Sequence, residues 1–498
     1  MSNFTQRHTD ACAYGLPHRC RVSRDQRGSL RMEASSPAAG RAARRKPLAA
    51  CFAALFALAA PQAFAATWVV NSCDDHGSNT LRDVVTNFAQ SGDTVDLSQL
   101  SCSVISLTTG AITIPQTSLD LQGPPNHITI SGKYNGTTEN DRIFNHTGTG
   151  TVEFYGLDII FGDLAPASGS AYGGGCIYSK GNVILSDTQV LSCNIAAPTG
   201  MVGYGGGVFA KGYVLALNSV ISGNSVSGSV GGTGGGVAAH GTLTLVNSTV
   251  SGNSAATFVG GAMARGGALI LGSTVSGNAA PTFGGLYVMG MSATDTLQIT
   301  NSTISGNAAS GGGAFAGAVG GVMSYVPTTV QNSTIAFNTA TLTITPGGSY
   351  APGLALSANS TSPAAIAVNL QSSILSNNTY GTSEADFSIT QKAGHSFTIT
   401  SADSLVRASI GPQPAPTISI ACPLLGPLRD NGGPTQTHAL MSRSPAIDAG
   451  NNNAGLTTDQ RGLGYPRLSG FAPDIGAYEV QQDDVIFNSG FEECPVLF

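Results

Sequence analysis

Charged side chains are scarce in this sequence. Asp, Glu, Lys and Arg make up 10% of its 498 residues, against about 25% in an ordinary globular domain. The 220 residues from Leu164 to Ser383 hold five of them, Lys180, Asp187, Lys211, Arg265 and Asp295. Glycoside hydrolysis ordinarily needs two carboxylates about 5 to 10 Å apart. This long stretch is therefore a poor place for acid–base catalysis.

Basic residues are especially rare beyond residue 65. The first 65 residues hold ten of the 22 Lys and Arg and three of the 28 acidic residues, so the remaining chain has a formal net charge of −13. A field of this sign repels polyanions, and no run of mixed basic and aromatic residues offsets it. We therefore expect no nucleic-acid partner.

Long apolar runs are also missing from the chain after residue 65, where no stretch approaches the ~20 residues that span a membrane. Before it, basic residues at 41–46 precede an apolar run at 48–60 and the sequence Ala63-Phe64-Ala65. This order is typical of a secretory signal peptide. We expect cleavage after Ala65, with the segment before Met32 an over-long start. The alternative, a membrane anchor, is disfavoured by the short apolar run.

Six of the nine cysteines lie after residue 65. An even number in an exported chain favours disulfides. Pairing neighbours gives Cys73 with Cys102, Cys176 with Cys193, and Cys422 with Cys494. A zinc site would need more closely spaced ligands than these.

One short phrase recurs through the middle of the chain. It reads NSVISGN at 218–224, NSTVSGN at 247–253, NSTISGN at 301–307 and NSTIAFN at 332–338. Aligning its final residue gives Asn194, Asn224, Asn253, Asn278, Asn307, Asn338 and Asn377, in steps of 25 to 39 residues. Steps of this size indicate a solenoid or array, in which each unit buries its apolar face against its neighbours. Catalysis has no use for so many copies, so the phrase predicts a scaffold.

The units between these asparagines have the pattern of short strands. Each has a glycine cluster, such as 205–207, and an alternating segment, such as Thr242-Leu243-Thr244-Leu245-Val246. Period-two alternation predicts strand, and a content of 65 glycines argues against helix. A propeller blade usually needs ~40 residues or more. We therefore predict an all-β fold, a right-handed, single-stranded parallel β-helix with an N-terminal cap and a small C-terminal module.

The stacking in such a coil explains the repeated residues. Equivalent positions of successive coils lie roughly 4.8 Å apart, so a recurring Asn can form an internal ladder of amide hydrogen bonds. The glycine clusters are expected at corners, where a positive φ or a close backbone approach excludes a Cβ.

The repeats from about 143 to 378 resemble those of right-handed parallel β-helix surface proteins of the polymorphic outer-membrane type. Residues 79–85, NTLRDVV, and 92–97, GDTVDL, are similar to the CSLREA segment of exported β-helix proteins, with Asn79-Thr80 where Cys-Ser would stand. Residues 424–479 resemble the choice-of-anchor Q domain in LGPLRDNGGPTQTHALMSRSPAIDAG, TDQRG and DIGAYE. The tail IFNSGFE, 486–492, is similar to C-terminal tags of exported Gram-negative proteins. These resemblances imply a secreted protein or one on the outer surface of a Gram-negative bacterium.

These patterns divide the chain into five predicted parts. They are a leader at 1–65, a CSLREA-like cap at 66–142, β-helix repeats at 143–400, the end of the solenoid with the choice-of-anchor Q-like module at 401–479, and a tail at 480–498.

The few basic residues of the repeats share one position, just before a turn glycine. This position holds Lys180, Lys211, His240 and Arg265, and then Met289. Stacked coils would align the first four as a column on one edge, and aligned like charges are unfavourable unless solvated or countered. The column predicts an anionic ligand, an acidic polysaccharide or cell-surface glycan. An exposed turn that accepts any long side chain is the simpler interpretation, which we prefer.

Acidic residues gather in the C-terminal module, at Asp430, Asp448, Asp459, Asp474 and Glu479. They could bind calcium, the one cofactor we consider, or cap turns beside neighbouring glycines. Turn capping is the preferred interpretation.

The leading functional hypothesis is an exported, non-enzymatic β-helix protein that offers a surface for adhesion or glycan binding. The alternative is a polysaccharide lyase or glycoside hydrolase of the pectate-lyase-like superfamily. Its residues would come from the more highly charged stretch that holds Glu139, Asp141, Glu153, Asp158 and Asp163.

Overall fold

The computed structural model describes residues 65–482 and 484, except 135–136, 139–140, 166–172, 199–200, 229–231, 312–316, 342–349 and 412–419. The predicted leader, most of the tail, Glu139 and Cys494 therefore lie outside the described residues. In the described part, helix is limited to α2 (Leu81–Asp83) and the π-helical turn η1 (Val84–Phe88). No described helix has the length and apolar character needed to cross a membrane.

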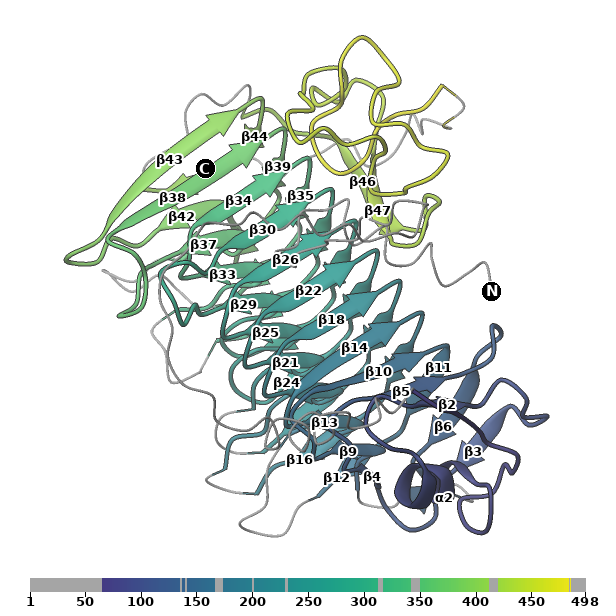
Figure 1. Cartoon of the computed structure of the whole chain (residues 1–498). Helices are drawn as coiled ribbons and strands as arrows, with labels where there is room; N and C mark the ends of the chain where they lie inside the picture. Colours follow the sequence, from purple (N-terminus) through teal and green to yellow (C-terminus); the bar gives the residue numbers. More distant parts are fainter. Residues whose placement is uncertain are drawn as a thin grey trace, which may run out of the picture. The chain divides into compact units, whose positions relative to one another are not determined.

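The described chain is a parallel β-solenoid, as predicted, with four stacked sheets that we call faces 1 to 4 (Figure 1). Face 1 consists of β1 (Thr67–Val69), β2 (Thr94–Asp96), β5 (Leu119–Gln122), β10 (Thr151–Tyr155), β14 (Asn182–Ser186), β18 (Val214–Leu217), β22 (Leu243–Val246), β26 (Ala268–Leu271), β30 (Leu297–Thr300), β34 (Thr328–Gln331), β38 (Ala365–Gln371) and β43 (Ser396–Ala402). Face 2 consists of β3 (Val104–Ser106), β6 (Ile128–Ser131), β11 (Leu157–Ile160), β15 (Gln189–Leu191), β19 (Val220–Ser222), β23 (Thr249–Ser251), β27 (Thr274–Ser276), β31 (Thr303–Ser305), β35 (Thr334–Ala336), β39 (Ile374–Ser376) and β44 (Leu405–Val406).

Two further faces complete each coil. Face 3 consists of β12 (Asp163–Leu164), β16 (Asn194–Ala196), β20 (Ser225–Ser227), β24 (Ser254–Ala255), β28 (Ala279–Ala280), β32 (Ala308–Ala309), β36 (Thr339–Ala340), β40 (Thr379–Tyr380) and β41 (Ser383–Glu384). Face 4 consists of β4 (Ile112–Ile114), β9 (Phe144–His146), β13 (Ile177–Ser179), β17 (Val208–Ala210), β21 (Val237–Ala239), β25 (Ala262–Ala264), β29 (Leu286–Val288), β33 (Val322–Ser324), β37 (Leu354–Leu356), β42 (Phe387–Ile389) and β45 (Ser409–Ile410). Two hairpins lie outside these faces, β7 (Lys133–Tyr134) with β8 (Thr137–Thr138) and β46 (Leu425–Arg429) with β47 (Thr437–Leu440).

The repeated phrase forms face 2 and its two corners. In NSTVSGN at 247–253, Asn247 takes a φ of 48° at the first corner and Gly252 a φ of 61° at the second. Between them, Val250 points into the apolar core, while Thr249 and Ser251 point outward because side chains alternate along a strand. The phrase therefore encodes one side of a coil.

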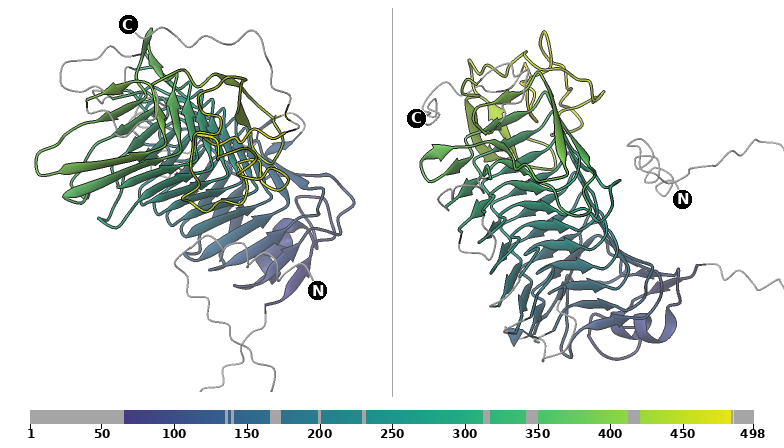
Figure 2. Two further views of the ribbon diagram at one scale, coloured as in Figure 1. Left: turned by 90° about the horizontal axis from the view of Figure 1, so that it is seen from above. Right: turned by 90° about the vertical axis from the view of Figure 1, so that its left-hand side faces the viewer.

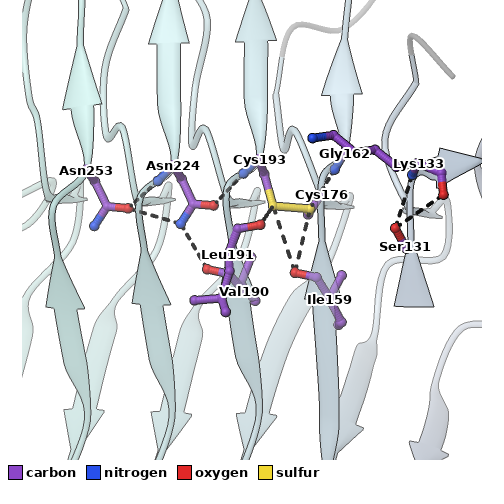
Figure 3. Close-up of a disulfide and its surroundings, with 10 residues drawn as sticks. All are labelled: Ser131, Lys133, Ile159, Gly162, Cys176, Val190, Leu191, Cys193, Asn224 and Asn253. Carbon is purple, nitrogen blue, oxygen red and sulfur yellow. Dashed lines mark hydrogen bonds between the residues drawn. A yellow bond between two sulfur atoms is a disulfide. The ribbon is translucent and has the colours of Figure 1, made fainter. Parts of the chain in front are cut away.

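The final asparagine of the phrase forms the predicted internal ladder, which runs along the stack (Figure 3). Asn253 Oδ1 accepts hydrogen bonds from the backbone N and the Nδ2 of Asn224, at 2.9 and 3.0 Å. Asn224 Nδ2 also donates to the Val190 carbonyl at 3.0 Å. The same pattern continues through Asn278, Asn307, Asn338 and Asn378. From Asn224 to Asn338 each of these buried amides bonds to the next amide and to a backbone carbonyl, with no ionisable side chain involved.

The ladder corrects the predicted alignment at both ends. Cys193, not Asn194, occupies the ladder position of its coil, because its backbone N donates to Asn224 Oδ1 at 2.9 Å. At the other end Asn378 is in the ladder, whereas Asn377 takes the corner position with a φ of 60°. Asp386 then closes the series by accepting from Asn378.

A second buried ladder, of hydroxyl groups, runs parallel to the first. From Ser248 onward each serine Oγ accepts from the backbone N of the serine in the preceding coil, as between Ser248 N and Ser273 Oγ at 3.0 Å, and Ser219 Oγ accepts from Thr188 N. Its members are Ser219, Ser248, Ser273, Ser302, Ser333, Ser373 and Ser404. They are the second letter of the phrase in each coil that repeats it.

Two of the three predicted disulfides are present. Cys73 bonds to Cys102 and Cys176 to Cys193. The second bridge lies at the end of the asparagine ladder, where Cys193 stands in place of an amide (Figure 3). The third predicted pair includes Cys494, which is outside the described residues.

The boundary predicted at 143 does not separate a cap from the solenoid. Strands between 66 and 142 already join faces 1, 2 and 4. The helical turns α2 and η1 precede β2, and Leu81, Val84 and Val85 belong to the solenoid's apolar core.

The C-terminal module packs on the outer side of face 2. The side chains of Thr274, Thr303 and Thr334 form hydrogen bonds with Gln436 O, Gln460 Oε1 and Ala477 N, at 2.7, 2.6 and 3.1 Å. The right-hand view of Figure 2 shows the module, in yellow, beside the later coils. The outward threonines of the repeated phrase are therefore its docking surface.

Candidate functional site

The predicted basic residues do lie in one register, between faces 4 and 1. Lys180, Lys211, His240 and Arg265 each follow a face 4 strand, and their backbone amides donate to consecutive coils. Met289 takes the next position, with its N bonded to Ala264 O at 2.9 Å. We call the first four residues the basic column.

The charge of the basic column comes from three of its four members. Burial, with the nearby charges of Arg265 and Lys211, lowers the pKa of His240 to about 4, so its imidazole is neutral at neutral pH. Lys180 and Lys211 are exposed, and Arg265 is partly exposed. Within the described ranges, none of the three cations has a carboxylate at ion-pair distance. The column is thus an uncompensated row of positive charge.

Aromatic side chains cover the outer side of face 4, next to the basic column. They come from the middle of face 4 strands, from the connections that enter this face and, for Tyr325, from the position just after β33. We call them the aromatic strip, and it consists of Tyr178, Tyr204, Phe209, Phe258, Phe283, Tyr287, Tyr325 and Tyr350.

The rings of the aromatic strip touch one another and the column. Phe209 and His240 lie edge to face at 4.8 Å between centroids, and Phe283 stacks on Tyr287 at 5.0 Å. Burial raises the pKa of Tyr287 to about 12. Tyr204 and Phe258 remain partly exposed over the buried rings.

Glycine makes room for this layer. A Cβ on Gly173 would lie 2.1 Å from the ring of Phe209, and a Cβ on Gly206 would lie 2.5 Å from the Ser225 carbonyl. The glycine clusters therefore allow the chain to return close to its own backbone and carry rings over face 4, as expected from the sequence.

This arrangement suits an extended anionic ligand with apolar faces. Cations in adjacent coils repeat at about the strand spacing of 4.8 Å, and an exposed ring face attracts the weakly positive C–H groups of a sugar ring. Sequence analysis found the column but missed the strip. The sequence could have predicted the strip, because an aromatic residue follows several of the glycine clusters by one to three positions.

The carboxylates of the alternative, enzymatic hypothesis do not converge. Glu153, Asp158 and Asp163 lie on faces 1, 2 and 3. Asp158 pairs with His127 at 2.8 Å, Asp163 accepts from Asn194 Nδ2 at 2.9 Å, and Asp141 accepts from backbone N atoms of Ala111 and Arg142. Glu139 lies outside the described residues.

The structure brings together one pair of carboxylates that sequence analysis did not predict. Asp120 and Glu153 occupy paired positions on neighbouring parallel strands, so their side chains point outward from face 1 side by side. Glu153 accepts a hydrogen bond from Ser186 Oγ at 3.1 Å.

The acids of the C-terminal module bind backbone amides and arginines. Asp430, Asp448 and Asp474 accept from the backbone N atoms of Gly432, Phe471 and Val480, at 2.8, 2.8 and 2.7 Å. Asp459 pairs with Arg461 at 2.7 Å and Glu479 with Arg467 at 3.2 Å. In the part of the chain that the structure describes, no group of three or more His, Cys, Asp or Glu is arranged to hold a metal. Calcium binding and turn capping both stay predictions: Asp430 accepts from the neighbouring Gly432, whereas Asp459 and Glu479 pair with arginines.

The chain was compared with protein families, curated proteins and solved structures. No protein-family model and no curated protein matches the chain in sequence. Among solved structures the chain is similar to the crystal structure of pectate lyase Pel9A, with 14% identity and a TM-score of 0.44 over 83% of this chain and 96% of that one. We base no functional conclusion on this likeness.

Proposed function

We propose that this chain is an exported, non-enzymatic surface protein that binds acidic polysaccharide along the basic column and the aromatic strip. The observation that carries the proposal is the register of Lys180, Lys211 and Arg265, three unpaired cations beside the aromatic strip. Export is supported by the signal-like leader, by the two disulfides and by the resemblance of the flanking segments to CSLREA and choice-of-anchor Q domains.

A periodic ligand fits the column better than a single small anion. Aligned cations repel one another across about 5 Å, and a polyanion that bridges them relieves this repulsion. Uronate-containing chains carry one carboxylate per acidic sugar and present C–H faces for the rings. Because the cations are at the surface, binding should weaken as salt screens them.

The test is binding to polygalacturonate in a titration at low salt, with neutral dextran as the control polymer. We expect the triple variant Lys180→Ala, Lys211→Ala, Arg265→Ala to bind at least tenfold more weakly. Removal of Lys392, an exposed lysine far along the chain, should have no effect. Conversely, Met289→Lys extends the column and should tighten binding. Equal affinity of the triple variant and the parent protein would overturn the proposal.

Glycan cleavage by Asp120 and Glu153 is the second candidate function. Two carboxylates on adjacent strands offer the acid and base, or the acid and nucleophile, of glycoside hydrolysis. Release of reducing ends from a panel of acidic polysaccharides, abolished in Asp120→Asn and Glu153→Gln, would favour this enzyme over the binding protein.

A further inference from the structure

A serine and a histidine meet where the C-terminal module docks. Ser305 ends β31 and points outward from face 2, and its Oγ lies 2.7 Å from Nε2 of His438 on β47. His438 Nδ1 lies 2.6 Å from the Gly426 carbonyl oxygen. A carbonyl can only accept, so Nδ1 carries the proton and Nε2 accepts from the serine hydroxyl.

This is the order of groups found in nucleophilic serine sites. A hydroxyl is bonded to a base, and the base is oriented by a third group, here the Gly426 carbonyl. Burial lowers the pKa of His438 to about 4, so the imidazole is neutral at neutral pH and Nε2 carries a lone pair toward the serine hydroxyl.

A pocket gives access to the pair. It has a volume of about 360 Å³, within the range of ~300 to 1,000 Å³ typical of ligand sites. Ser305 and His438 line it together with apolar groups from Phe337, Pro427 and Leu428. Ser305 is 2% exposed and His438 3%, so the reacting atoms lie away from bulk water.

Phe337 adds a second observation at the same place. It takes a φ of 57°, at a corner where Gly223, Gly252, Gly277 and Gly306 stand in other coils and where Phe161 takes a φ of 61° in an early coil. A bulky residue there costs of order 1 to 3 kcal/mol. Its ring lies 5.0 Å from that of His438, so the strained residue forms a wall of the pocket beside the base.

We propose that Ser305 and His438 form an acyl-transfer dyad that acts on esters of small apolar acids. Ser305 Oγ attacks the ester carbon while its proton passes to His438 Nε2. The bond to the alcohol breaks, and the alcohol leaves with that proton. Water then gives a proton to Nε2 and its oxygen to the acyl carbon, which releases the acid and returns the proton to Ser305. This activity is independent of glycan binding on face 4.

The chain supplies a matched control for the test. Ser251 holds the same position of the phrase as Ser305, but its Oγ contacts Ser222 at 3.1 Å and no histidine. The two serines share their position in the coil, so a difference in reactivity between them reports on what only Ser305 has, His438 and the pocket.

The experiment treats the full chain with diisopropyl fluorophosphate at pH 7.5, maps the adduct by peptide mass spectrometry, and follows hydrolysis of p-nitrophenyl butyrate. We expect modification of Ser305 and not of Ser251, unchanged hydrolysis in Ser251→Ala, and loss of at least about 100-fold in rate in His438→Gln, the share of a general base. Hydrogen exchange of the module amides establishes whether that variant keeps the module docked.

Absence of both adduct and hydrolysis in the unmodified protein would overturn the proposal, whatever the variants do. So would a His438→Gln protein that stays docked and reacts as fast as the parent. Either outcome leaves the pair as a docking contact between module and solenoid.

Discussion

The solenoid interior and the C-terminal module both bury many polar groups, but they satisfy them by different means. Along the solenoid, neutral amides and hydroxyls bond to copies of themselves, as Asn253 does with Asn224 and Asn278. In the module, Arg461 has a side chain with no exposed area, pairs with Asp459, and lies between the rings of Tyr465 and Tyr478 at 3.9 and 3.8 Å.

The difference follows from repetition. A stack of identical coils places like groups next to one another, so a charge would meet its own copy and only groups that both donate and accept can repeat. The module has no repeat and can pair opposite charges. A neutral ladder loses a few hydrogen bonds when one member is removed, whereas a buried ion pair leaves an uncompensated charge.

The largest expected effect is therefore in the module. Arg461→Met leaves Asp459 buried without its partner and should destabilise the module by about 3 to 5 kcal/mol. Hydrogen exchange of the amides at 446–480 measures this local stability. Arg443→Ala, at an exposed position, serves as the control. If Arg461→Met leaves the exchange protection of these amides unchanged, the buried ion pair of the module is no more costly to break than the ladder.

A ladder residue should matter less. Asn278→Ala deprives Asn253 N and Nδ2 of their acceptor and should cost about 2 kcal/mol. Exchange of the neighbouring ladder amides reports the loss, and Asn87→Ala, at an exposed side chain, should stay within about 0.5 kcal/mol. A cost for Asn278→Ala as great as that for Arg461→Met would break the comparison.

The smallest expected effect is a dependence of stability on pH, which we expect in the module and not in the ladder. Burial and the neighbouring Asp474 raise the pKa of Glu479 to about 7 from 4.5. The folded module favours the protonated carboxyl of Glu479. The stability that this carboxyl contributes to the module is therefore fully present below pH 4.5 and is lost as the pH rises through 7. Acidification from pH 8 to 6 should therefore stabilise the module by about 1 kcal/mol. The slope should disappear in Glu479→Gln, while the ladder amides, which do not titrate, should show no such change. A slope that persists in this variant has another source.

Much of the fold could be predicted because its determinants repeat. The spacing of Asn253, Asn278 and Asn307 fixes the coil, and alternation fixes which side chains enter it. The errors at Asn194 and Asn377 arise at the ends, where Cys193 replaces an amide and where Asn377 and Asn378 compete for one position. The sequence alone does not predict which of two adjacent asparagines points into the coil.

The candidate sites depend on contacts between distant segments and were less accessible. The basic column could be found because its members share a slot in the repeat. The aromatic strip depends on how connections fold back over face 4, and the pairing of Ser305 with His438 joins residues 133 positions apart. No periodicity relates the module to the coil on which it docks.

The asparagine ladder has a direction. The amide-to-amide bonds all run from an earlier coil to a later one and end on the carboxyl of Asp386, whose oxygens accept from Asn378 and Ala408. Each Nδ2 also donates to a backbone carbonyl of the preceding coil, as Asn253 does to Ile221. Truncation should therefore be asymmetric. Removing the later coils leaves two buried donors of the last asparagine without an acceptor, its backbone N and one Nδ2 hydrogen, whereas removing the earlier coils leaves one Nδ2 hydrogen without its carbonyl. The C-terminal end of the ladder therefore needs an acceptor for two donors at once, and Asp386 Oδ1 supplies it to the backbone N and Nδ2 of Asn378.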